Sequence, residues 1–250
     1  MRVMVAGALG QRPDRGGHAW LFLEYLLGLQ ELGCDVCFVD RLEPGMCHDG
    51  AGRPCAPSES VEAAHVASVM EWAGLGDRWA VLVDGGHHSL GMERGRLGAW
   101  ASGADLLIDV MGYLQAPDLL AAPARRLFLD IDPGFPQWWA AQGLHDAFGR
   151  HDVYATFGTN LGRPGCAVPD TGISWTPTLP PVVLSQWPVS AAVDRGITTV
   201  GSWRGPFAPL EVDGRRFGLR AHAMRPIAGL PESCAGFGVD FSIALDVDPA

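Results

Sequence analysis

The chain has 250 residues and a mass of 26.6 kDa, which is enough for one large domain or two small ones. All 18 basic residues are arginines, so mechanisms that need a Schiff-base lysine, a P-loop lysine or a kinase lysine are excluded. The net charge of -10 opposes binding to nucleic acid and to anionic membranes.

The start of the chain predicts a strand, a loop, a helix and a second strand. Residues 3–7 are an apolar run that ends in glycine, and a polar loop follows at residues 8–17. Residues 18–32 fit a helix that is buried on most of its surface, because its polar stripe is narrow. The stripe consists of Glu24, Gly28 and Glu31. With a strand at residues 34–40, the unit is βαβ and predicts a parallel sheet.

Further along the chain, four apolar runs predict strands of the same sheet. They are residues 79–84, 104–109, 125–130 and 152–157. The runs are continuous rather than alternating, as is typical of strands that helices cover on both faces. Four of the predicted strands end in an aspartate, namely Asp40, Asp84, Asp109 and Asp130. Because ligands bind outside the carboxyl ends of such strands, we expect these carboxylates to lie around one crevice.

The composition changes over residues 162–188, where prolines limit helix formation. We therefore expect a Rossmann-like domain over residues 1–188, a linker over residues 189–196 and a second, smaller α/β domain over residues 197–250. The predicted elements of the second domain are two strands, at residues 197–201 and 241–247, and a hairpin turn at residues 212–215.

The first residues lack the apolar core of a signal peptide, and no run of about 18 apolar residues could span a bilayer. We therefore expect a cytoplasmic protein without an integral membrane segment. In that compartment the six cysteines are expected to be reduced. Cys34 and Cys37 have CxxC spacing, but they fall beside or within an apolar strand and no second CxxC follows. This favours core packing over a zinc site, and we expect no metal.

The loop and helix at the start of the chain carry a family resemblance. A first strand, a glycine-rich loop with Gly16-Gly17-His18, a long apolar helix and a second strand resemble the opening of the bacterial GT-B fold glycosyltransferases. The resemblance is strengthened by the proline-rich connection and by a second domain that opens with the residues Thr198-Thr199-Val200-Gly201-Ser202-Trp203.

The resemblance implies an α/β fold with a Rossmann-like parallel sheet domain of GT-B type, which binds the acceptor. A second α/β lobe, which binds the nucleotide-sugar donor, follows it and is incomplete here. The implied reaction moves a sugar from the nucleotide-sugar to a hydroxyl of a small-molecule acceptor. The resemblance implies no cofactor besides the nucleotide-sugar co-substrate. It requires no metal, because in this fold helix dipoles and basic side chains usually offset the charge of the leaving diphosphate. Since most of the second lobe is missing, we expect little activity from this chain alone.

In related enzymes a histidine of the first loop takes the proton of the acceptor hydroxyl, and an aspartate from a later strand end orients it. The resemblance therefore implies His18 and Asp109 as the catalytic residues, with the helix N-terminus favouring a neutral imidazole. The residues expected to bind the acceptor are Gly16, Gly17, Asp130, Asp132, Phe135 and Asn160. Those expected to bind the donor are Thr199, Gly201, Ser202, Trp203 and Arg204.

Other interpretations stay open. His18 can instead cap the helix or bind the acceptor without proton transfer. The whole chain can be a non-catalytic carbohydrate-binding or nucleotide-sugar-binding protein of the same fold. A dinucleotide-dependent oxidoreductase is the third alternative, because Asp40 lies where a ribose-binding carboxylate is expected. However, residues 7–10 do not match the GxGxxG fingerprint of that class.

Overall fold

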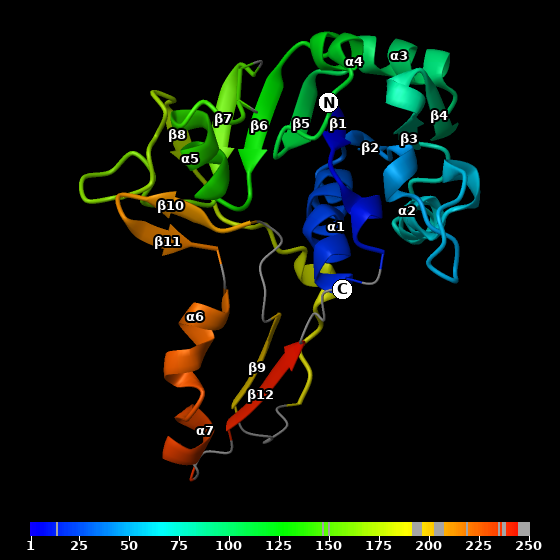
Figure 1. Cartoon of the computed structure of the whole chain (residues 1–250). Helices are drawn as coiled ribbons and strands as arrows, with labels where there is room; N and C mark the ends of the chain where they lie inside the picture. The colour runs from blue at the N-terminus through cyan, green and yellow to red at the C-terminus, as the bar shows by residue number, and fades with distance from the viewer. Residues whose placement is uncertain are drawn as a thin grey trace. The chain divides into compact units, whose positions relative to one another are not determined.

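A computed structural model of the chain contains two units, Met1–Trp187 and Pro188–Ala250 (Figure 1). For residues 197–202, 223 and 239–244 the structure describes the backbone alone. It describes the chain except for Asp14, Ala147, Arg150, Leu219, Ala235 and residues 192–196, 203–207, 237–238 and 245–250.

The first unit is built on an eight-stranded sheet with the strand order β4-β3-β2-β1-β5-β6-β7-β8, which runs from right to left across Figure 1. Seven strands are parallel, and β4 is antiparallel to β3 at one edge. The strands are β1 Arg2–Ala6, β2 Asp35–Arg41, β3 Trp79–Val83, β4 His88–Gly91, β5 Leu106–Val110, β6 Arg126–Asp130, β7 Val153–Thr156 and β8 Trp175–Pro177. The predicted parallel sheet of the first unit is confirmed.

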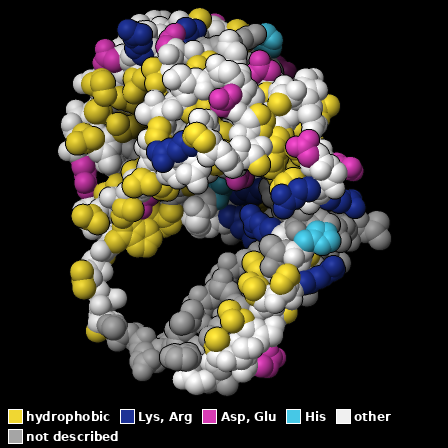
Figure 2. Space-filling view, turned by 90° about the vertical axis from the view of Figure 1, so that its left-hand side faces the viewer, with side chains coloured by type: hydrophobic (Ala, Val, Ile, Leu, Met, Phe, Trp, Pro, Cys, Tyr) yellow, Lys and Arg dark blue, Asp and Glu magenta, His cyan; other side chains and the backbone are white. Residues whose placement is uncertain are grey.

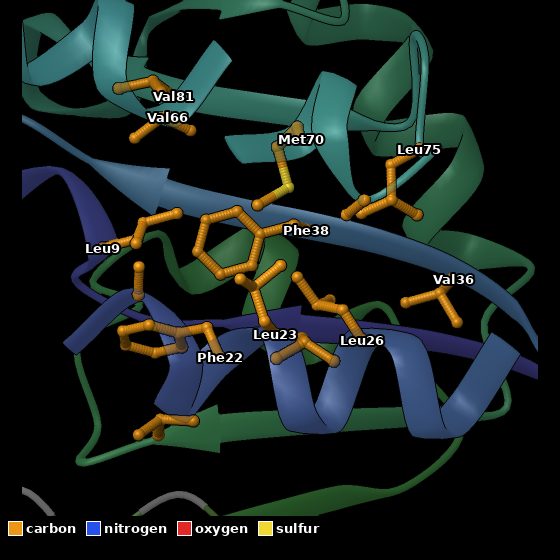
Figure 3. Close-up of a cluster of buried hydrophobic side chains, with 14 of the residues drawn as sticks. Leu9, Phe22, Leu23, Leu26, Val36, Phe38, Val66, Met70, Leu75 and Val81 are labelled. Atoms are coloured by element: carbon orange, nitrogen blue, oxygen red, sulfur yellow. The ribbon is translucent and has the colours of Figure 1, made fainter. Parts of the chain in front are cut away.

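Helices cover both faces of this sheet. On one face, α1 and α2 close the main hydrophobic core over β1 and β2, and Figure 3 shows Phe22, Leu26, Phe38 and Met70 pointing into it. On the other face, α3 and α4 pack over a second core. The helices of the first unit are α1 Gly16–Glu31, α2 Val61–Trp72, α3 Arg94–Ser102, α4 Pro117–Ala121 and α5 Phe135–Ala141. The predicted Rossmann-like α/β class is therefore confirmed.

Short 3-10 helices occupy several of the connections. They are η1 Leu9–Gln11, η2 Pro44–Met46, η3 Pro57–Glu59, η4 Asp84–Gly86 and η5 Leu184–Gln186. The first helix begins two residues before the predicted start, and its end is marked by Gly33 with a φ of +76°. A positive φ is readily adopted by glycine, which explains why this helix ends there.

Residues 180–187, here called the strap, return over the polar stripe of α1. Glu24 is only 9% exposed, and its carboxylate accepts hydrogen bonds from the backbone amide of Val183 and the indole of Trp187. A Cβ atom at Gly28 would lie 3.5 Å from the Val183 side chain. The strap therefore covers Glu24 and Gly28 of the polar stripe, and the Glu24 carboxylate is hydrogen-bonded to it.

The second unit contains a parallel strand pair and a hairpin. The pair is β9 Ile197–Ser202 with β12 Val239–Ala244, and the hairpin is β10 Leu210–Val212 with β11 Arg215–Phe217. Asp213 and Gly214 both have positive φ, as a tight hairpin turn requires, so the predicted turn is confirmed. The short helices of this unit are α6 Arg220–Met224, η6 Arg225–Ile227 and α7 Leu230–Ser233.

Among the described residues, no helix has the length and apolar character needed to span a bilayer. Figure 2 shows acidic side chains scattered singly over the face that it displays, among hydrophobic and polar ones.

Candidate functional site

The strand order creates a topological switch point between β1 and β5. From β1 the chain continues to β2 on one side, whereas β5 is followed by β6 on the other side. In open α/β sheets, ligands bind at the carboxyl ends of the strands beside such a point. Here three loops meet that edge: the described residues of 7–15, residues 111–116 and residues 131–134, which follow β1, β5 and β6 and are called the switch-point loops below.

His18 lies in the first turn of α1, half-buried beside the first of these loops. Its Nε2 atom is 2.8 Å from the carbonyl oxygen of Ala8. Because a carbonyl oxygen only accepts, this contact places the hydrogen of a neutral imidazole on Nε2 and leaves a lone pair on Nδ1. The ring packs edge-on against Phe22, with centroids 5.2 Å apart. The ring is thus anchored in a tautomer that leaves Nδ1 able to accept a proton.

Gly16 and Gly17 leave the start of α1 open. Apart from its chain neighbours and the backbone of α1, a Cβ atom placed on either glycine would have no atom of the described residues within 4 Å, whereas one on Gly7 would lie 2.0 Å from the Phe22 ring. Gly7 is therefore required by packing. Gly16 and Gly17 are not, which leaves their backbone accessible to a ligand.

Charged and polar side chains from all three loops influence one another at this edge. Burial raises the pKa of the Tyr113 hydroxyl, the carboxylate of Asp132 raises it further, and the guanidinium of Arg12 opposes both effects. Asp132 and Arg12 are exposed to solvent. Asp132 was expected to bind the acceptor. Arg12 and Tyr113 were not expected, because a single arginine or tyrosine in a loop carries no distinctive sequence signal.

Asp109 pairs with a different histidine from the one expected. Side chains alternate along a strand, and Asp109 faces the α3 and α4 side of the sheet while its neighbours Ile108 and Val110 face α1. Its carboxylate lies 3.1 Å from Nε2 of His151. Burial raises the pKa of Asp109, and the hydrogen bond from His151 opposes that shift. The expectation that Asp109 orients His18 is therefore wrong, and Ala8 holds the His18 ring instead.

Asp130 is fully buried at the end of β6. Its carboxylate accepts hydrogen bonds from Nε2 of Gln137 at 2.7 Å and from the hydroxyl of Thr156 at 2.9 Å. It also accepts one from the backbone amide of Asp132 at 3.2 Å, and burial raises its pKa. This carboxylate ties β6, β7 and α5 together, which accounts for it without a ligand.

Asp40 also has a structural role, because its carboxylate binds backbone amides of the fold. It is 2% exposed, and its carboxylate accepts from the backbone amides of Gly10 at 2.7 Å and Arg41 at 2.6 Å. Burial raises its pKa to about 7. Its carboxylate therefore holds the first switch-point loop rather than presenting acceptor atoms to a ribose. Asp84 is exposed and follows β3. The strand-end aspartates consequently do not share one crevice, because three of them are buried with separate partners.

The remaining predicted residues fall in several places. Phe135 starts α5 and packs with the rings of Trp138 and Trp139, and Asn160 is exposed in the loop after β7. For the donor side, Thr199, Gly201 and Ser202 belong to β9, of which the backbone is described. Trp203 and Arg204 lie outside the described residues.

The cysteines belong to the core and to the loops. Cys37 is fully buried in β2, and burial raises the pKa of its thiol to about 12. Among the described side chains, no three histidines, cysteines, aspartates or glutamates gather to hold a metal ion.

Comparison with known proteins adds no family. No model of a known protein family matches the chain, and a search of curated proteins finds no match either.

Proposed function

We propose that the protein is a glycosyltransferase of GT-B type, which moves a sugar from a nucleotide-sugar donor to a hydroxyl acceptor at the switch-point loops. The acceptor oxygen would attack the anomeric carbon of the donor sugar, and the bond to the diphosphate would break with its electron pair on the diphosphate. Nδ1 of His18 would take the hydroxyl proton.

One observation carries this proposal: the contact between Nε2 of His18 and the carbonyl of Ala8, at the carboxyl edge of the sheet. A general base needs a fixed orientation, and this contact supplies it; in the neutral imidazole it also leaves the lone pair on Nδ1. The open backbone at Gly16 and Gly17 supports close approach of a substrate beside that nitrogen. Arg12, whose guanidinium acts on Tyr113, offers a cationic side chain for negative charge at the switch-point loops.

The fold supports the proposal at a coarser level. The first unit is Rossmann-like, and the second unit contains the parallel pair β9 and β12. A donor site at residues 199–204 stays a prediction. Because a fold alone hosts many activities, the proposal depends on the site residues.

The test is a transfer assay with the intact chain, a panel of nucleotide-sugars and a panel of hydroxyl acceptors, following release of the nucleoside diphosphate. Because little activity is expected from this chain alone, the proposal predicts a slow release that requires both donor and acceptor. Gly17→Leu should lower this release without lowering the melting temperature, because the side chain would occupy the open space at the start of α1. Tight donor binding with no transfer to any acceptor would instead support a non-catalytic binding protein.

A further inference from the structure

A cavity of about 430 Å³ lies at the carboxyl end of β5, on the side of the sheet that α3 and α4 cover. Asp109 and His151 line its floor, and their side chains are 1% and 3% exposed. Gln115, His145 and Asp146 line its rim and are exposed. This volume is within the range of small-molecule sites.

The two floor residues are held rigidly. Asp109 accepts hydrogen bonds from Nε2 of His151 at 3.1 Å and from the backbone amide of Leu114 at 3.2 Å. The other ring nitrogen of His151 lies 3.5 Å from the carbonyl oxygen of Phe148. The ring also packs edge-on against Phe128, with centroids 5.3 Å apart. Because its ring is held between the carboxylate of Asp109 and the carbonyl of Phe148, His151 positions Asp109.

Packing alone does not account for this pair. The rings around it come from Phe128, Phe148, Tyr154 and Trp175, which form an apolar cluster. Two apolar side chains of similar size would pack against that cluster without the cost of burying a carboxylate and an imidazole. A buried carboxylate at a cavity floor is useful when a ligand donates hydrogen bonds to it, and a carboxylate can accept about four.

The lining residues define the chemistry of the ligand. The carboxyl groups of Asp109 and Asp146 accept hydrogen bonds, and carboxylates at the cavity repel a phosphate. Gln115 and His145 both donate and accept. The described titratable side chains here do not form a group able to hold a metal ion. Hydroxyl groups on a ligand both donate and accept hydrogen bonds, so they match this mixture of donors and acceptors best.

We propose that this cavity is a binding site for a small uncharged polyhydroxylated ring, a hexose or a cyclitol, which donates a hydroxyl hydrogen bond to Asp109. The site is separate from His18, because Asp109 and His18 lie on opposite faces of the sheet. It does not depend on the proposed transfer reaction, since its test contains no nucleotide-sugar.

The experiment is saturation-transfer NMR on the intact chain with glucose and myo-inositol as probes. Cyclohexanol serves as a six-membered ring with one hydroxyl, and inorganic phosphate serves as an anionic competitor. We expect transfer to glucose or myo-inositol, weaker transfer to cyclohexanol and no displacement by phosphate. Equal transfer to cyclohexanol, displacement by phosphate, or no transfer to either probe up to its solubility limit would overturn the proposal.

Two variants locate the binding. Asp109→Asn keeps the shape but removes the charged acceptor, and should weaken binding about tenfold or more. Gln115→Ala alters only the exposed rim, so it tests the site even if Asp109→Asn lowers stability. The matched control is Gln186→Ala, an exposed glutamine in η5. Unchanged binding in Gln115→Ala and in a folded Asp109→Asn protein would assign the probe to another site and overturn the proposal.

Discussion

Replacing Glu24 by alanine should detach the strap from α1 and lower stability by about 2–3 kcal/mol. The loss is dominated by the buried backbone amide of Val183, because an unsatisfied buried donor costs about 1–3 kcal/mol. The indole of Trp187 adds less, since this side chain is 51% exposed and can turn to water. For a unit of this size, a loss of about 2–3 kcal/mol lowers the melting temperature by about 4–12 °C.

Urea unfolding of the intact chain, followed by tryptophan fluorescence, measures this change. The rings of Trp20 and Trp187 lie 4.8 Å apart, so their emission also reports whether the strap is in place. Hydrogen exchange at the Val183 amide should accelerate in the variant. The matched control is Glu31→Ala, which lies on the same helix and accepts from the hydroxyl of Ser185, but is exposed. The control should change stability by less than about 0.5 kcal/mol. Equal losses in the two variants would refute the reasoning.

Three further predictions concern buried polar groups and glycines. Asp40 has a pKa of about 7 in the folded chain and 3.8 as its ordinary value, so the folded state keeps a proton that the unfolded state has lost. Stability should therefore fall as the pH rises from about 4 to about 7, by up to roughly 4 kcal/mol. Asp40→Asn should flatten that slope in urea titrations at several pH values, and an unchanged slope would contradict the assignment. Thr156→Val removes one of the donors to Asp130 and should lower the free energy of unfolding by about 1–2 kcal/mol, as measured by thermal unfolding. An unchanged stability would show that this hydrogen bond does not tie β6 to β7. Gly7→Ala should destabilise the fold by about 1–3 kcal/mol because of the contact with the core ring, while Gly17→Ala should be neutral or stabilising by up to about 1 kcal/mol. The reverse order of melting temperatures would show that the packing around these glycines is wrongly described.

Most of the sheet of the first unit could be predicted because the inner parallel strands β1, β2, β3, β5 and β6 are largely buried and therefore appear as continuous apolar runs. Strands β4 and β8 were missed. His88–Gly91 is short and half exposed at an edge, and Trp175–Pro177 contains a proline that normally argues against a strand. The strap was also missed, because nothing in the sequence indicates that residues 180–187 return to the polar stripe of α1.

The site was predicted less well than the fold. Hydrophobic periodicity predicts His18 at the start of a helix and Asp109 in a strand. The two residues lie on opposite faces of the sheet because side chains alternate along a strand, and that alternation depends on the register of the strand. His151 was missed, because its role depends on a contact with a residue 42 positions away in the chain. In the sequence, aspartates at strand ends suggest ligand binding. In the structure, Asp40 and Asp130 instead accept hydrogen bonds that hold loops and strands together.

The central claim is that His18 accepts a proton, and the most direct test compares His18→Ala with His18→Gln under conditions where the wild-type chain transfers sugar. Glutamine can still donate a hydrogen bond to Ala8 but cannot act as a base. Both variants should therefore lose about 10²- to 10⁴-fold in kcat with donor KM almost unchanged. Restoration of turnover by glutamine would show that His18 only holds the loop, and wild-type turnover in the alanine variant would remove His18 from the reaction.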